Sequence, residues 1–365
     1  MKVLISRLEL VNLIGKIQGV VSVKPTLPIL GNILLEAMND ELILSATDLT
    51  VSLRVFCPAK VLEEGAITLP ARRFFQLCRE LTTPQLQIET TSPEVALVHA
   101  GTSHFKINGM HKSEFPSFPN FSDGKKVTLP SQQLKECLSR TAFAAARDDS
   151  KQIINGISLE IRSGLLTFIA TDGKRVAKLS SPLSFTNEIT ECCILPLKAV
   201  EEMVKILDVK ETNTVLILMK ERVALEVGST LLVSKLLMGK YPDVNRIIPQ
   251  KSPQPISLHR DELTSLLRQV SLFTTENNLA VRFTFLPGEL HLSAMSGELG
   301  EGKVHMPVNY QGAKQDIAFN PHYFLDVLRH TADETVYFDF TDPYNPGLLT
   351  DSSSAEFVIM PMRLE

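Results

Sequence analysis

Ala170-Thr171-Asp172-Gly173-Lys174-Arg175-Val176 is the stretch around which the rest of the sequence can be ordered. It follows the apolar run 165–169, and a shorter copy, Ala46-Thr47-Asp48, follows the apolar run 42–44. The copies begin at residues 170 and 46, which are 124 residues apart, about the length of a domain. The aspartate of each copy is interpreted as a turn former that closes a hairpin. The same polar turn after two strands indicates an internal duplication.

Two further patterns each occur three times. The first is a short alternating strand followed by an apolar stripe at i, i+3, i+4 and i+7, which is typical of an amphipathic helix. It begins at residues 2–6, 126–130 and 255–259. The second is a strand that leads into a helix through a proline, at residues 67–70, 194–196 and 317–321. Each third of the chain is therefore predicted to hold two helices and several strands.

The predicted fold class is α+β, with three copies of one domain in which two helices pack on antiparallel sheets. The segments 115–125 and 249–255 are rich in Pro, Ser and charged residues, so we interpret them as linkers. The expected domains are residues 1–120, 126–248 and 255–365. Ser131 is the expected N-cap of the third helix. The six expected helices span residues 7–20, 71–81, 131–144, 197–207, 260–272 and 321–330.

Length and composition describe an ordinary globular chain. It has 365 residues, of which 44% are hydrophobic and 21% are charged, and this length favours two or three domains. No run of about 18 apolar residues predicts a membrane span. The N-terminal apolar stretch meets Arg7 and Glu9 too soon for a signal peptide. We expect a cytoplasmic protein that has no membrane partner.

Neither the cysteines nor the histidines form a recognisable metal motif. The five cysteines contain no C-x-x-C spacing, and we expect them to be buried and reduced: Cys57, Cys78, Cys137, Cys192 and Cys193. The eight histidines are scattered, and none stands four residues from another with a Glu partner. The sequence therefore predicts no metal site and no cofactor.

Charge is distributed unevenly between the expected helices and the rest of the chain. The helices contain twelve Lys or Arg residues and eight Asp or Glu residues, a net charge of +4, whereas the whole chain carries −4. The remainder therefore carries −8. A mildly basic helix surface suits loose, sequence-independent contact with phosphates. Ordinary solvated helix faces would show the same count, so this alternative stays open.

Several segments, in their order and spacing, resemble one family, the bacterial sliding clamp, which is the beta subunit of DNA polymerase III. The resemblance covers the whole chain. The segments that carry it are residues 24–32, 46–49, 70–75, 170–175, 241–243 and 358–364.

The resemblance implies a head-to-tail homodimer that closes a ring around duplex DNA, with the helices lining the hole. Such a clamp holds the DNA topologically and confers processivity without catalysis of its own. It is loaded by an ATP-dependent clamp loader. The implied partners are duplex DNA, a second copy of the chain, the polymerase alpha subunit, the clamp loader delta subunit, and other polymerases and repair proteins that carry clamp-binding peptides.

The resemblance also implies three sets of site residues. Basic and polar positions that match DNA contacts are Lys24, Arg72, Lys151, Gln152 and Lys198. Gln152 and Ile153 stand where some relatives carry tyrosines. The pocket for partner peptides matches Ile154, Thr171, Gly173, Lys174, Arg175, Val176, Pro242, Arg246, Ile247, Asn320, Tyr323, Tyr344, Pro346, Val358, Ile359, Met360, Pro361, Met362, Arg363 and Leu364.

The third set is the dimer contact. Its matching residues are Arg73, Phe105, Ile107, Leu272, Phe273, Glu298 and Glu301. Phe105 as an ordinary core residue is an open alternative, and so is a C-terminal tail that merely packs on a core. Lys174 replaces a His of some relatives, and Glu365 extends the usual terminus by one residue.

Two other classes of protein compete with a clamp. An enzyme is not favoured, because the chain has no G-x-S-x-G, P-loop or paired-carboxylate motif, and the stretch 297–302 lacks the strand–helix context of a dinucleotide loop. A repeat scaffold that binds only proteins would share the peptide pocket but not the basic helices. Only the middle turn, 170–176, keeps the Gly-Lys-Arg sequence, so we interpret it as the copy specialised to hold partners.

Overall fold

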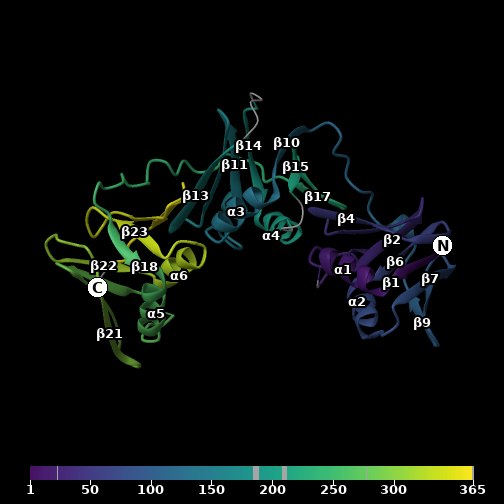
Figure 1. Ribbon diagram of the computed structural model, residues 1–365, viewed down its shortest axis with the longest axis horizontal. Helices are drawn as coiled ribbons and strands as arrows, with labels where there is room; N and C mark the ends of the chain where they lie inside the picture. Colours follow the sequence, from purple (N-terminus) through teal and green to yellow (C-terminus); the bar gives the residue numbers. More distant parts are fainter. Residues whose placement is uncertain (23, 184–188, 208–211, 277, 364–365) are drawn as a thin grey trace. The chain divides into compact units, whose positions relative to one another are not determined.

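The computed structural model describes the chain except for residues 23, 184–188, 208–211, 277 and 364–365 (Figure 1). Its contacts divide the chain into two compact units. The first unit is Met1–Lys135 with Lys198–Leu236, and the second is Glu136–Leu197 with Leu237–Glu365. Among the described residues, no helix is long and apolar enough to cross a membrane.

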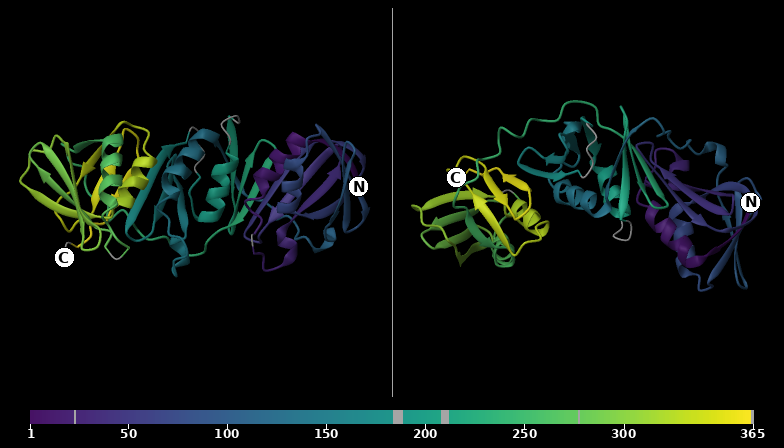
Figure 2. Two further views of the ribbon diagram at one scale, coloured as in Figure 1. Left: turned by 90° about the horizontal axis from the view of Figure 1, so that it is seen from below. Right: turned by 45° about the horizontal axis from the view of Figure 1, so that its top comes forward.

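The first unit is built from a five-stranded sheet, β5-β1-β7-β8-β9, and an eight-stranded sheet, β10-β15-β16-β17-β4-β3-β2-β6. Helices α1 and α2 contact each other (Figure 2). The elements of this unit are β1 (Lys2–Ser6), α1 (Arg7–Ile17), β2 (Asn32–Met38), β3 (Glu41–Thr47), β4 (Val51–Pro58), β5 (Lys60–Glu63), β6 (Gly65–Pro70), α2 (Ala71–Glu80), β7 (Gln85–Ser92), β8 (Val95–Ala100), β9 (Ser103–Asn108), β10 (Lys125–Pro130), α4 (Leu197–Ile206, which starts at the unit boundary), β15 (Asn213–Leu218), β16 (Arg222–Val227) and β17 (Thr230–Lys235).

The second unit contains an eight-stranded sheet, β14-β11-β12-β13-β25-β24-β23-β18, and a four-stranded sheet, β21-β20-β19-β22. Helices α5 and α6 lie side by side (Figure 2). Its elements are α3 (Ser131–Ala142, whose first turn falls in the first unit), β11 (Gly156–Arg162), β12 (Leu165–Thr171), β13 (Arg175–Pro182), β14 (Glu191–Pro196), β18 (Ile256–His259), α5 (Arg260–Ser271), β19 (Val281–Leu286), β20 (Glu289–Ser296), β21 (Gly300–Pro307), β22 (Gln315–Phe319), α6 (Pro321–Arg329), β23 (Thr335–Asp339), β24 (Gly347–Thr350) and β25 (Glu356–Ile359).

The apolar stripes do form six helices on antiparallel sheets, as the sequence predicts. Each helix ends one to three residues before its predicted end; Leu81, for example, is already extended after α2. The expectation for Ser131 is wrong. Ser131 is the first residue of α3 rather than a capping residue, and its buried hydroxyl has no hydrogen-bond partner.

The cysteine expectation is correct in part. Cys57, Cys78 and Cys137 are buried, and Cys193 is half-buried. Burial raises the pKa of the Cys78, Cys137 and Cys193 thiols to about 12, so they stay protonated. Cys192 is exposed, contrary to the expectation. Cys192 lies near the start of β14, where residues 191–193 are exposed or half-buried, and burial begins only at Ile194.

The central copy contributes strands to both eight-stranded sheets. Its last strand, β17, pairs with β4 of the first copy, with Leu232 opposite Leu53. The last strand of the third copy, β25, pairs in the same antiparallel way with β13 of the central copy, with Val176 opposite Val358. Successive copies are therefore joined by continuous main-chain hydrogen bonding, with the last strand of each copy added to the sheet of the copy before it.

The turn between β12 and β13 precedes one of these joints. The Thr171 hydroxyl accepts a hydrogen bond from the Gly173 N–H (3.0 Å) and donates one to the Arg175 carbonyl (2.7 Å). One carboxylate oxygen of Asp172 accepts hydrogen bonds from the N–H groups of Lys174 (2.9 Å) and Arg175 (3.0 Å). Gly173 has the left-handed φ of +84° that this closed turn requires.

The turn between β3 and β4 precedes the other joint and repeats the same hydrogen bonds. The Thr47 hydroxyl accepts from the Leu49 N–H (3.0 Å) and donates to the Val51 carbonyl (3.1 Å). The Asp48 carboxylate accepts from the N–H groups of Thr50 (2.9 Å) and Val51 (2.7 Å). The prediction that the two aspartates close hairpins is confirmed. Leu49, with φ +73°, takes the place of the glycine.

Replacing Gly173 by alanine is expected to lower the free energy of unfolding by about 1–2 kcal/mol, because a Cβ is crowded by the following carbonyl in the left-handed conformation. An added Cβ would meet no other atom within 4 Å, so the cost is conformational. Chemical denaturation measures it. Gly297→Ala is the matched control, because its Cβ also meets nothing within 4 Å and its φ is not positive. An equal cost in both variants would contradict this account.

Candidate functional site

A groove with a volume of about 260 Å³ opens beside the turn between β12 and β13. All of it lies within the second unit. Nine of its twelve lining residues belong to the set that the family resemblance assigns to a peptide pocket. The lining residues are Lys151, Ile154, Thr171, Gly173, Arg175, Val176, Pro242, Asp243, Val244, Ile247, Val358 and Met360.

Three lining residues are not in the peptide-pocket set. Asp243 and Val244 directly follow Pro242 in the segment 236–255 between β17 and β18, and this adjacency is the signal by which they could have been included. Lys151 is expected at DNA but lines the groove in this structure. It therefore places a positive charge at the groove beside the negative charge of Asp243.

The floor of the groove is apolar because it lies over the joint between β13 and β25. Val176 and Val358 are opposite each other in this joint, and both are buried. They belong to one core cluster with Val244 from the segment 236–255. A concave, largely apolar surface with a few polar groups at its edge is the usual form of a site for apolar side chains.

Tyr241 fixes the segment 236–255 to the turn between β12 and β13. Its side chain is buried, its hydroxyl donates a hydrogen bond to the Gly156 carbonyl (3.1 Å), and it accepts one from the Thr171 N–H (3.1 Å). Burial raises the pKa of this phenol well above its usual value, so the hydroxyl keeps its proton. Tyr241 thus positions Pro242 and the residues after it at the groove.

Arg175 binds other parts of the protein with most of its guanidinium. Its Nε lies 3.0 Å from Asp172 and its Nη1 lies 2.6 Å from Asp326 on α6, while Nη2 donates to the Phe143 carbonyl (2.8 Å). The guanidinium also lies 4.7 Å from the ring centre of Tyr323. Arg175 and Tyr323 therefore join α6 to the turn, and a peptide would meet a guanidinium that is already hydrogen-bonded.

The other polar residues of the predicted pocket differ in how accessible they are. Asn320 is buried and caps α6, because its side chain accepts the His322 N–H (3.0 Å). Arg246 has a side chain that is 86% exposed and pairs with Asp243 (3.1 Å). Arg246 is thus open to a ligand, and the predicted Arg363 is exposed as well. Tyr344 is 85% exposed and, like Pro346, does not line the groove.

The C-terminal tail is held along the second unit. The Met360 N–H donates to the Lys174 carbonyl (2.9 Å), and the Met362 N–H donates to the Ala318 carbonyl (2.7 Å). Met362 and Arg363 line a separate hollow of about 540 Å³ against the four-stranded sheet. Ile359 is buried and Pro361 is half-buried, and neither lines the groove. Leu364 and Glu365 lie outside the described residues.

The residues expected at DNA are exposed, but one of them has a partner. Lys24, Arg72, Lys151 and Gln152 are exposed. Lys198, at the start of α4, forms an ion pair with Asp48, the aspartate of the turn between β3 and β4. This pair ties α4 to the joint between the first two copies, much as Arg175 ties α6 to the second joint.

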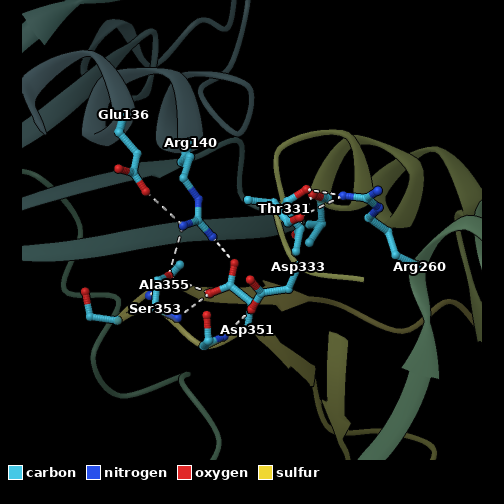
Figure 3. A network of polar contacts seen from close by, with 12 residues as sticks. Glu136, Arg140, Arg260, Thr331, Asp333, Asp351, Ser353 and Ala355 are labelled. Carbon is cyan, nitrogen blue, oxygen red and sulfur yellow. Dashed lines mark hydrogen bonds and ion pairs between the residues drawn. The ribbon is translucent and has the colours of Figure 1, made fainter. Parts of the chain in front are cut away.

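Arg140 on α3 lies in a buried network of polar contacts (Figure 3). Its side chain is only 8% exposed and pairs with Asp351, which is 3% exposed. Arg140 also donates to the Ser353 hydroxyl (3.0 Å) and to Glu136 (3.3 Å). Breaking a buried ion pair by removing one partner typically costs about 3–5 kcal/mol. Arg140 therefore stabilises the packing of α3 on the turn before β25.

Most of the residues expected at the dimer contact lie on or beside the edge strands β9 and β21, whereas Arg73 lies on α2. Phe105 is half-buried and Ile107 is buried on β9, the edge of the five-stranded sheet, so Ile107 packs largely in its own core. Leu272 is 73% exposed after α5, and Phe273 lies against Gly302 of the edge strand β21. Arg73, Glu298 and Glu301 are exposed, and Glu301 pairs with Lys303 (2.6 Å).

Comparison with known proteins covers the whole chain. Residues 1–119, 128–243 and 245–363 match the N-terminal, central and C-terminal domains of the DNA polymerase III beta subunit, respectively. The beta sliding clamp of Chlamydia muridarum is 46% identical over 364 residues, covering 100% of this chain and 99% of the relative. That of Escherichia coli K12 is 31% identical over 368 residues, covering 100% of both.

Solved structures agree with these matches. The DNA polymerase III beta subunit of Pseudomonas aeruginosa superposes with a TM-score of 0.94 at 29% identity, and the DNA polymerase sliding clamp of Bacillus subtilis with 0.94 at 25% identity. Each covers 100% of both chains. The chain therefore belongs to the family of the DNA polymerase III beta subunit, the non-catalytic sliding clamp of DNA replication.

Proposed function

We propose that two copies of this chain close head to tail into a ring around duplex DNA and tether the replicative polymerase to it. The free sheet edges carry this proposal. Within the chain, the last strand of one copy pairs with the strand after the Thr-Asp turn of the preceding copy, as β17 with β4 and β25 with β13. The first copy's last strand, β9, and the third copy's corresponding strand, β21, are both edge strands.

A joint of the same kind between two chains would pair β9 of one with β21 of the other. Each chain has one strand of each kind, so the contact is heterologous, and it forms a closed assembly when the rotation between chains completes a circle. Unprotected edge strands invite pairing with another chain, and burying them in a ring removes both edges. The exposed Leu272 beside β21 would become buried in this joint.

A ring that encircles DNA explains how a protein with a net negative charge can stay associated with it. Lys198 and Arg140 are engaged by carboxylates, which leaves fewer free bases than the sequence count suggests. Weak contacts from exposed residues such as Lys24 and Arg72 suffice when a ring prevents escape, and weak contacts also permit sliding. The ring would be opened and placed on DNA by an ATP-dependent clamp loader.

Once a clamp loader and ATP have placed it on nicked circular DNA, the protein is expected to stay there during gel filtration and to be lost once the circle is linearised, because a ring cannot slide off a closed circle. The measurement follows labelled protein in the DNA-containing fractions. A scaffold that binds only proteins would elute free of both DNAs. A conventional DNA-binding protein would stay on both, and either result would reject the clamp.

Replacing Leu272 and Phe273 by alanine is expected to convert the dimer into monomers at micromolar concentration. The two changes remove apolar area worth about 2 kcal/mol or more per large side chain, at both joints of the ring. Sedimentation velocity measures the change. Leu165→Ala is the control, since Leu165 is also exposed (46%) but lies on β12, away from β9 and β21. A dimer that survives the double change would contradict the assigned joint.

We propose that the groove at the second joint binds the clamp-binding peptides of the polymerase alpha subunit, the clamp loader delta subunit and other DNA-processing proteins. Apolar peptide side chains would rest over Val176, Val358 and Met360. Lys151 and the exposed Arg246 would meet acidic or carbonyl groups at its edge. This occupancy is supported by the shape and apolar floor of the groove.

Ile247→Asp is expected to weaken binding of the polymerase's clamp-binding peptide at least about tenfold, because burying an uncompensated carboxylate costs more than 1.4 kcal/mol. Ile247 is 42% exposed, so the change spares the core. Fluorescence anisotropy with the labelled peptide measures affinity. Tyr344→Ala, which alters an exposed residue outside the groove, should change affinity less than twofold. Equal effects of both changes would place the peptide elsewhere.

A further inference from the structure

Two histidines face each other across the β8–β9 hairpin of the first unit. His99 and His104 are directly opposite in the strand register. Their Nδ1 atoms are 2.6 Å apart, and the rings meet edge to face with centroids 4.8 Å apart. A two-residue turn with Gly101 at φ +63° sets this register. Two imidazole nitrogens at this distance share one proton, because one must donate and the other accept.

At 2.6 Å the two nitrogens are at hydrogen-bond distance, so a chelate needs them to move apart by about 0.3 Å or more. Imidazole nitrogens lie about 2.0–2.1 Å from a first-row metal ion, which places two of them about 2.9 Å apart at a right angle and about 3.4 Å apart at the tetrahedral angle. The observed 2.6 Å is nearer to the right-angled value. Tetragonal nitrogen and oxygen sites are typical of Cu²⁺ and Ni²⁺, and Cu²⁺ binds most strongly in this series.

We propose that His99 and His104 bind a divalent transition-metal ion in a tetragonal site through their two Nδ1 atoms. Cu²⁺ is the ion expected to bind most strongly. Binding releases the shared proton and directs both lone pairs at the metal. No group of three or more His, Cys, Asp or Glu side chains suited to a metal is found among the described residues. Water would therefore complete the coordination, and the ion would exchange freely.

The surroundings of the pair tolerate a cation. On the other side of His99 lies Gln87, and Gln87 donates a hydrogen bond to Glu89 (3.2 Å). Lys2 lies 3.0 Å from Glu89 and lowers the pKa of this carboxyl by hydrogen bonding, with a smaller contribution from His99, so Glu89 stays charged. Lys106, which is exposed two residues beyond His104, is the positive charge that would repel a bound cation. The pair is open to solvent, which provides an entry path.

A second cross-strand pair in the chain lacks this geometry. His291 and His305 are opposite each other on β20 and β21, with ring centroids 5.4 Å apart and the rings tilted by 30°. The Nε2 of His291 is 2.7 Å from Glu289, and this hydrogen bond lowers the pKa of the Glu289 carboxyl. One nitrogen of this pair is thus turned towards a carboxylate. The second pair serves as an internal control.

The test adds Cu²⁺ alone to the full-length protein and records its paramagnetic resonance spectrum together with the binding isotherm. The expected result is one site per chain with two nitrogen ligands. His99→Gln and His104→Gln should each remove the two-nitrogen spectrum and weaken binding at least about tenfold, since even loss of a residue that only supports a metal ligand costs that much. His291→Gln, on β20 and outside the proposed β9–β21 joint, should leave both readouts unchanged.

Loss of the spectrum in His291→Gln but not in His104→Gln would overturn the proposal, and so would tighter binding of Zn²⁺ than of Cu²⁺. The site uses one chain only, so it does not depend on the proposed ring. The same titration on the Leu272→Ala, Phe273→Ala variant separates the two ideas. Unchanged Cu²⁺ binding is expected there whether or not the dimer forms, and a site lost with the double change would contradict a single-chain chelate.

Discussion

Main-chain pairing between copies is the constraint on which the rest of this structure depends. β17 extends the sheet of the first copy at β4, and β25 extends the sheet of the central copy at β13. Backbone hydrogen bonds are directional and leave little freedom in register, so each joint fixes the strands that flank it. The same rule leaves β9 and β21 as open edges, and the proposed ring follows from satisfying them.

Each joint is preceded by the same Thr-Asp turn, and in each case a base anchors that turn to a helix. Lys198 on α4 pairs with Asp48, and Arg175 after the second turn pairs with Asp326 on α6. The second turn adds glycine at its left-handed position and a groove beside it. The joint therefore occurs twice, and among the described residues the groove with the buried valine floor lies at the second one.

Much of the fold is predictable from the sequence because its signals are local and repeated. The apolar stripes predict the six α-helices of the described residues, and Asp48 and Asp172 predict the hairpin turns. Contacts between residues far apart in sequence left no local signal. Asp48 and Lys198 are 150 residues apart and Arg140 and Asp351 are 211 apart, so a count of helix bases overstated the charge available to DNA.

The groove was predictable only in part. The family resemblance predicts most of its lining residues. Asp243 and Val244 line it as well, because Tyr241 hydrogen-bonds the segment 236–255 in place. The histidine pair was missed because a search at helical spacing cannot detect two residues that a hairpin places opposite each other. The exposure of Cys192 could not be read from the apolar run, because burial on β14 begins only at Ile194.

Hydrogen–deuterium exchange at the backbone amides of β9 and β21 tests the central claim most directly, because it reports main-chain pairing itself. In the ring, the outward-facing amides of both strands should exchange slowly at concentrations where the protein is dimeric, and fast once dilution separates the chains. Fast exchange in β9 and β21 of a protein that sedimentation shows to be dimeric would contradict the proposed joint.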